Sequence, residues 1–216
     1  MSQSVNILSY ARGVTMSKYP DLPPQHAVAV RTERIYLRPV TPEDLSPLHT
    51  IRMNSNVMQY MPGVETEKDA VNSHSVRRIE LMMKPDGFSF AIVVPDPAHE
   101  SSIAEGLAHG TVIGFIGITA PPEVFYILDD KFWGSGYATE ALQGFLDTYW
   151  NAFPEGLRGL DEWTRDFLET HIIVGNEGSE RVAVKCGFVH VADRSTPSHG
   201  EEKEKKIFRL QRPRRG

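Results

Sequence analysis

The chain has 216 residues, of which 40% are hydrophobic, and a formal net charge of −5 with both signs interspersed. This size fits one domain with extensions, and the charge balance excludes a protein that binds nucleic acid through a basic face. The single cysteine, Cys186, excludes an internal disulfide, and the sequence has no Cys/His cluster that would suggest a metal site. It also has no apolar stretch that would suggest a membrane span or a signal peptide. We therefore expect a cytoplasmic protein.

The N-terminal part is expected to open with an arm and then one strand. Residues 1–31 have few periodic apolar positions and contain the proline-rich run YPDLPPQ. Alternating apolar residues predict a strand over residues 34–40. Thr41 is followed by a proline and, three residues later, by an aspartate, which is typical of a helix start. A second helix is predicted to begin near Thr66 and to end near Met83.

The central part of the chain predicts a run of strands that ends in a glycine-containing turn. Residues 88–94, 111–118 and 123–130 are rich in β-forming residues and are bounded by prolines or polar loops. The segment KFWGSG then leads into an amphipathic helix. The apolar positions of that helix recur at helical spacing: Ala138, Ala141, Leu142, Phe145 and Tyr149.

The C-terminal part predicts further strands around one short helix. A short helix over residues 163–168 and a strand over residues 170–176 are expected first. Asn176 then caps a helix that Gly187 ends in a left-handed conformation. Two closing strands, joined by the charged turn GEEKEKK, are predicted in residues 188–194 and 205–213. The fold class is therefore α/β (α+β), with a mixed, mostly antiparallel sheet of about six or seven strands flanked by helices.

The two glycines at 134 and 136 permit an anion to approach the first turn of the following helix. Unpaired N–H groups and the helix dipole favour negative charge there. The turn is not a P-loop, because no lysine follows its glycines, and it is not a dinucleotide fingerprint, because Thr139 stands where the third glycine would be. A strand-to-helix turn without a ligand is an equally good interpretation of the glycines alone.

Asn176 lies at the end of the next predicted strand and could serve the same ligand. Polar groups at neighbouring strand ends form a crevice for an extended molecule. A pyrophosphate in the glycine turn and an amide near Asn176 would describe coenzyme A. A simple helix cap is the alternative role for this asparagine.

Together these motifs carry a family resemblance. The segments YILDDKFWGSGYATEAL and NEGSERVAVKCGF, preceded by TERIYLRPVTPEDL and NSNVMQYMPG, resemble the GNAT acetyltransferases. They are most similar to the branch of the ribosomal-protein N-acetyltransferases, the RimJ/RimL-like proteins. The resemblance spans residues 32–212, which implies a GNAT-fold domain followed by a basic tail at 213–216.

The resemblance implies that acetyl-CoA is the cosubstrate. Its pyrophosphate would bind the backbone amides of the turn, and the strand before the turn would offer backbone groups of Ile127 and Leu128 to the pantetheine arm. Asn176 and Ser179 would also contact the cosubstrate. The turn residues concerned are Gly134, Ser135, Gly136, Tyr137, Ala138 and Thr139.

The catalytic groups follow from the same resemblance. Glu123 is the candidate base and Ser179 the candidate donor to the leaving thiolate, while a solvent-facing glutamate and a first-turn serine are the structural alternatives. His171 is a weaker candidate base. Many relatives use a tyrosine as thiolate acid, but Ala183 occupies that position here. Cys186 reads as a small buried residue and not as a nucleophile.

The expected function is acetyl transfer to a primary amine of a small molecule or a protein N-terminus, by a monomer or homodimer. Two alternatives stay open: a CoA-binding protein without catalysis, and an acyltransferase that uses another acyl-CoA. Acceptor specificity is expected from residues 54–63 and from the long connections at 95–110 and 151–169.

Overall fold

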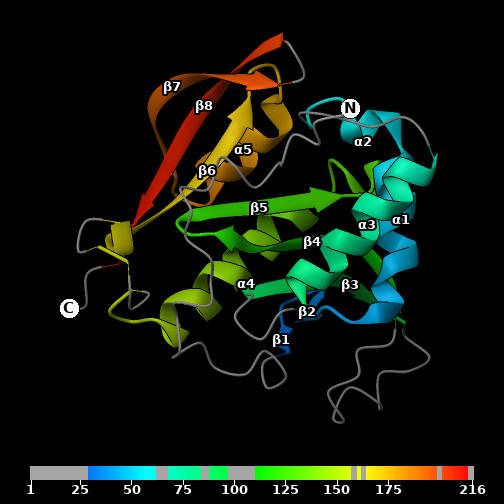
Figure 1. The fold of residues 1–216 in the computed structure, drawn as a ribbon. Helices are drawn as coiled ribbons and strands as arrows, with labels where there is room; N and C mark the ends of the chain where they lie inside the picture. Colours follow the sequence, from blue (N-terminus) through cyan, green and yellow to red (C-terminus); the bar gives the residue numbers. More distant parts are fainter. Residues whose placement is uncertain are drawn as a thin grey trace.

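The computed structural model describes residues 29–61, 68–83, 88–96, 110–156, 160–161, 164–198 and 201–213. Within these residues the strands form one sheet in the order β1-β2-β3-β4-β5-β6-β8-β7 (Figure 1). The strands are β1 Val30–Arg31, β2 Tyr36–Pro39, β3 Phe88–Pro95, β4 Gly110–Ala120, β5 Glu123–Leu128, β6 Phe167–Ile173, β7 Val189–Ser198 and β8 Glu201–Gln211. The α-helices are α1 Leu45–Met53, α2 Ser55–Met58, α3 Lys68–Met82, α4 Tyr137–Ala152 and α5 Glu177–Lys185. None of these helices is long and apolar enough to cross a bilayer.

The sheet is antiparallel except at its centre, where β5 and β6 run parallel. These two strands pair only at Glu123 and Glu169, at their N-terminal ends. Beyond this pair they diverge, and α5 follows the diverging strand (Figure 1). The centre of the sheet is therefore open toward the C-terminal ends of β5 and β6.

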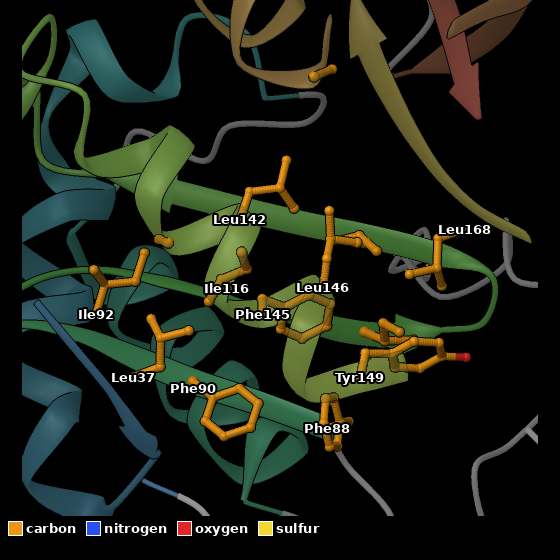
Figure 2. Close-up of a cluster of buried hydrophobic side chains, with 14 of the residues drawn as sticks. Leu37, Phe88, Phe90, Ile92, Ile116, Leu142, Phe145, Leu146, Tyr149 and Leu168 are labelled. Carbon is orange, nitrogen blue, oxygen red and sulfur yellow. The ribbon is translucent and has the colours of Figure 1, made fainter. Parts of the chain in front are cut away.

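Side-chain alternation along the strands gives the sheet two buried faces. On one face, Phe90, Ile92 and Ile116 pack with Phe145 and Leu142 of α4 (Figure 2). On the other face, residues of the same strands pack with α1 and α3, including Ala91, Val93 and Phe115. Because β3 is buried on both faces, it reads as a continuous apolar run instead of an alternating one.

Several predicted boundaries are confirmed. The backbone N–H of Thr41 donates to the Asp44 carboxylate at 2.8 Å, which completes the predicted capping box. That box opens a short 3-10 turn, Pro42–Asp44, which continues into α1. The Asn176 side chain caps α5, and Gly187 ends that helix with φ +87°.

The strand count and three other expectations need correction. The sheet has eight strands instead of six or seven, because the two-residue strand β1 pairs with β2 inside the segment expected as an arm. The helix expected at 163–168 is only a 3-10 turn, Thr164–Asp166, and β6 begins at Phe167. Most of the predicted turn GEEKEKK belongs to β8, whose Glu and Lys residues pair across the hairpin with β7. An exposed two-stranded edge accommodates alternating charges without burying them. Thr66 and Trp163 lie outside the described residues.

Phe145 tests the packing of α4 against the sheet. Its buried ring contacts Phe88 and Tyr149, with centroids 5.5 Å and 6.2 Å away. Phe145→Ala should lower the free energy of unfolding by about 3–5 kcal/mol, because it leaves a cavity. Urea denaturation measures this loss. The exposed substitution Asp147→Asn on the same helix should change stability by less than about 0.5 kcal/mol, and an equal loss in both variants would contradict the packing role.

Candidate functional site

The glycine turn lies between β5 and α4, as the sequence predicts. Gly134 and Gly136 have φ of +73° and +85°, which are left-handed values that favour glycine. Within the described part of the chain, Glu140 is the first residue of α4 whose N–H finds a backbone acceptor, the carbonyl of Gly136 at 3.0 Å. The N–H groups of residues 134–139 donate to no described residue. The turn thus gathers unpaired donors at the positive end of a 16-residue helix.

An arginine from the β1–β2 connection supports this turn. The Arg34 Nη1 group donates to the Ser135 carbonyl at 2.9 Å, and its Nε group donates to the Glu140 carboxylate at 2.7 Å. The backbone N–H of Arg34 and the Thr32 hydroxyl donate to the other Glu140 oxygen at 2.7 Å and 2.6 Å. The guanidinium also lies 4.6 Å from the centre of the Tyr137 ring. We refer to Thr32, Arg34 and Glu140 as the turn clamp.

The register of β5 decides which backbone groups face the opening beside it. The Glu169 N–H donates to the Pro122 carbonyl on the β6 side, whereas the Asp129 N–H donates to Ile113 on the β4 side, both at 2.9 Å. Since backbone groups of successive residues in a strand point to opposite edges, Tyr126 and Leu128 face the opening. Ile127 pairs with Phe115 of β4, so of the two predicted residues only Leu128 turns its backbone groups to the opening, together with Tyr126.

Two side chains border the opening at β5. The Trp133 indole donates to the Leu128 carbonyl at 3.1 Å, which leaves the Leu128 N–H for another partner. The Tyr126 hydroxyl donates to the Ser179 carbonyl at 3.0 Å and so connects β5 to α5 across the divergence. Burial raises the pKa of Tyr126 well above its usual range, so this phenol stays protonated.

Asn176 and Ser179 lie at the start of α5. The Asn176 Oδ1 atom accepts from the Ser179 N–H at 3.1 Å, which confirms the capping role. The cap uses only the carbonyl oxygen of this side chain, so the amide Nδ2 group can still donate elsewhere. The Ser179 side chain is half-buried, and its hydroxyl interacts with the Tyr126 phenol. The Asn176 amide therefore keeps a donor for the opening, and the Ser179 hydroxyl lies next to the Tyr126 side chain.

Glu123 begins a row of ionisable side chains on the α1–α3 face of the sheet. One Glu123 oxygen lies 3.4 Å from His171 Nδ1, and His171 Nε2 lies 3.3 Å from a Glu169 oxygen. Glu169 also accepts from Arg209 at 2.6 Å. Burial opposes ionisation of Glu169, but hydrogen bonds and positive charge from His171 and Arg209 outweigh it and lower its pKa. The partly buried Arg78 of α3 interacts electrostatically with Glu123.

This row has the geometry of a proton-transfer path. A neutral imidazole donates to only one of two carboxylates, whereas an imidazolium donates to both. His171 lies between Glu123 and Glu169, hydrogen-bonded to Glu169 at 3.3 Å and within ion-pair distance of Glu123 at 3.4 Å. Glu123 is 42% exposed and lies at the accessible end of the row. The structure thus brings together the two bases that the sequence offered as alternatives.

The surroundings of Cys186 do not favour a nucleophile, and Ala183 has no side-chain group that could act as the thiolate acid. Burial raises the pKa of the Cys186 thiol to about 11, so it is protonated near neutral pH. Its Sγ atom lies 3.6 Å from the Thr139 carbonyl, where α5 packs on α4. Ala183 is fully buried in the core.

Sequence reasoning did not identify the turn clamp, Tyr126 or Glu169 as site residues. Arg34 and Glu140 belong to the quoted motifs TERIYL and YATEAL, but their pairing joins positions 106 residues apart. Only their opposite charges within those motifs could have indicated the pair. Tyr126 precedes the predicted Ile127, and its role depends on strand register, which the sequence pattern leaves undefined.

In this chain, β5 diverges from its parallel neighbour β6 next to a glycine turn at the N-terminus of α4. The family model of the acetyltransferase (GNAT) domain matches residues 34–189. The chain therefore belongs to the GNAT acetyltransferase family, which confirms the resemblance seen in the sequence. No curated protein matches the chain in sequence.

Solved structures of this family share the fold at low sequence identity. The ribosomal-protein-S5-alanine acetyltransferase from Vibrio fischeri is 18% identical, with a TM-score of 0.60 over 86% of this chain and 97% of that one. The ribosomal L7/L12 N-acetyltransferase RimL in complex with CoA is 15% identical, with a TM-score of 0.59 over 85% and 98%. The microcin C7 self-immunity acetyltransferase MccE, in complex with acetyl-CoA and AMP, is 17% identical, with a TM-score of 0.60 over 83% and 93%.

The pH dependence of stability tests the Glu140 contacts. Burial opposes ionisation of Glu140, but hydrogen bonds from Thr32 and Arg34 and the Arg34 charge lower its pKa from the ordinary 4.5. A lowered carboxyl pKa stabilises the fold above the ordinary value, and this contribution is lost as pH falls through the folded pKa. Glu140→Gln should therefore cost about 1–3 kcal/mol near neutral pH.

Urea denaturation from pH 7 to pH 3 measures this effect. The difference between the native protein and Glu140→Gln should shrink below about pH 4.5. The exposed substitution Glu202→Gln on β8 controls for the general effect of removing one carboxylate. A difference that stays constant with pH would show that Glu140 ionisation does not stabilise the fold.

Proposed function

We propose that the chain is an acetyl-CoA-dependent N-acetyltransferase that moves an acetyl group directly to a primary amine. The observation that carries this proposal is the glycine turn, whose unpaired N–H groups lie between β5 and α4 beside the opening of the sheet. These donors fit the pyrophosphate of acetyl-CoA. The free N–H of Leu128 and the Asn176 amide fit the amide-bearing pantetheine arm. Family membership and the relatives solved with CoA or acetyl-CoA support the same cosubstrate.

The row of ionisable groups supplies the base for this chemistry. A primary amine is protonated near neutral pH and must lose a proton before its nitrogen can attack the acetyl carbonyl carbon. Glu123 accepts this proton directly or through one water, and His171 takes it up from Glu123. The C–N bond forms as the C–S bond breaks, and the nitrogen releases its second proton to solvent to give the amide. The departing thiolate takes a proton from the Ser179 hydroxyl, which solvent then restores.

The acceptor is an amine of a small molecule or a protein N-terminus. Relatives of this fold include enzymes that acetylate ribosomal proteins, which supports an acceptor of the second kind. The accessible end of the row is acidic, and a carboxylate favours the approach of a cationic amine. We place the catalytic domain at residues 32–212 and propose that it acts as a monomer or homodimer in the cytoplasm.

Calorimetric titration with acetyl-CoA tests the cosubstrate. The native protein should bind one acetyl-CoA with a dissociation constant of about 1 µM to 1 mM, and it should bind neither NADH nor ATP comparably. Gly136→Glu should abolish the binding, because a non-glycine residue is strained at φ +85° and its Cβ would lie 3.2 Å from Arg34 Nη2, so the turn must shift. Gln143→Glu adds the same charge at an exposed position of α4 and should bind normally. Undiminished binding by a folded Gly136→Glu variant would exclude the turn as the pyrophosphate site.

Glu123→Gln tests the base. The variant should lower kcat by about 100-fold or more at neutral pH, while the dissociation constant for acetyl-CoA stays unchanged. The loss should diminish at high pH, where the free amine needs no base. The pH–rate profile with a reactive amine measures this effect, and Glu202→Gln is the matched control. A profile identical to that of the native protein would remove Glu123 from the mechanism.

A further inference from the structure

Arg34 contacts the glycine turn and the first turn of α4 through three different groups. It contacts the Ser135 carbonyl, the Glu140 carboxylate and the Tyr137 ring at the same time. Its Nη2 atom lies 3.2 Å from the position that a Cβ atom at Gly136 would occupy. The guanidinium therefore lies directly against the turn. Its side chain is nevertheless 43% exposed, so it does not serve as a buried core group.

The contact to Ser135 determines where a neighbouring N–H group points. In a trans peptide the C=O of one residue and the N–H of the next point in opposite directions. Because Arg34 holds the Ser135 carbonyl at 2.9 Å, the N–H of Gly136 points away from Arg34. Glycines on both sides of Ser135 leave this peptide unit free to rotate in the absence of such a contact. Arg34 thus selects one orientation of a donor that the proposed anion site needs.

Arg34 also neutralises a charge that would oppose an anion. Glu140 lies in the first turn of α4, and its lowered pKa keeps it ionised near neutral pH. A carboxylate one turn from a bound pyrophosphate would repel it. The Arg34 Nε and Nη2 atoms both lie 2.7 Å from the same Glu140 oxygen, Oε2, and the guanidinium charge offsets that of the carboxylate. The arrangement places a positive charge behind the turn and holds it through Glu140 and Thr32.

We propose that Arg34 is a positioning residue for the pyrophosphate of acetyl-CoA. It orients the Ser135–Gly136 peptide and cancels the charge of Glu140 from the rear of the turn. The β1–β2 connection is therefore part of the cosubstrate site, although it does not line the opening between β5 and β6. This inference rests on the proposed function and adds a specific contribution of the first strands to it.

A comparison of two ligands tests this role. Acetyl-CoA contains the pyrophosphate, and S-acetylpantetheine has the same acyl arm without it. Arg34→Ala should weaken acetyl-CoA binding about 10–100-fold, as expected for loss of charge-assisted hydrogen bonds. Binding of S-acetylpantetheine should change less than about twofold, since a positioning role at the turn acts only through the pyrophosphate. Arg34→Lys keeps the charge but lacks the planar fork, so it should show an intermediate loss.

A double variant separates charge cancellation from general destabilisation. Arg34→Ala leaves Glu140 unpaired, so adding Glu140→Gln should recover part of the lost acetyl-CoA affinity. Arg194→Ala removes one exposed arginine from β7 and is the matched control. If the native protein binds acetyl-CoA but Arg34→Ala binds it equally well, or loses both ligands equally, the role of Arg34 is overturned while the proposed function stands. If the native protein does not bind acetyl-CoA, both proposals fail.

Discussion

The single pairing between β5 and β6 is the constraint on which the site depends. Parallel strands normally satisfy each other's backbone groups along their length. Here they pair only at Glu123 and Glu169, so the backbone groups of Tyr126 and Leu128 face a gap. No described strand pairs with these backbone groups, although the Trp133 indole donates to the Leu128 carbonyl. An extended ligand with its own amides can complete the pairing that β6 leaves unmade, and this explains why the opening lies in the centre of the sheet and not at its edge.

The same divergence lets the two faces of the sheet cooperate. The turn clamp and α4 lie on one face, with the aromatic core of Figure 2 beneath them. The row from Glu123 to Arg209 lies on the other face, because Glu123 alternates with the side chains of β5 that pack on α4. A closed sheet would separate these groups. Here the strands diverge between them, so the two faces meet at the opening beside β5.

Local chemistry explains which features the sequence predicts well. Helix α4 and its turn combine regular apolar spacing with two glycines that need left-handed backbone, and Asn176 is a strong cap. The sequence predicts the structure less well where segments that are distant in the chain meet. The two-residue β1 has no periodicity of its own, and the charged strand β8 reads as a turn because its partner lies on an exposed hairpin. The place of Ile127 depends on register, and the contact of Arg34 with Glu140 depends on the assembled fold.

The turn clamp also has a consequence for the order of folding. Arg34 and Glu140 are 106 residues apart, and β2, β3 and β4 lie between the clamp and β5 in the sheet. Contacts of such sequence separation form only after much of the loop-closure entropy has been overcome. A nascent chain that ends shortly after α4 would already contain every glycine of the turn, yet its donors would acquire their orientation only once the first strands had docked. The orientation of the turn therefore requires β1 to α4 to be assembled together, but not the strands that follow α4 in the chain.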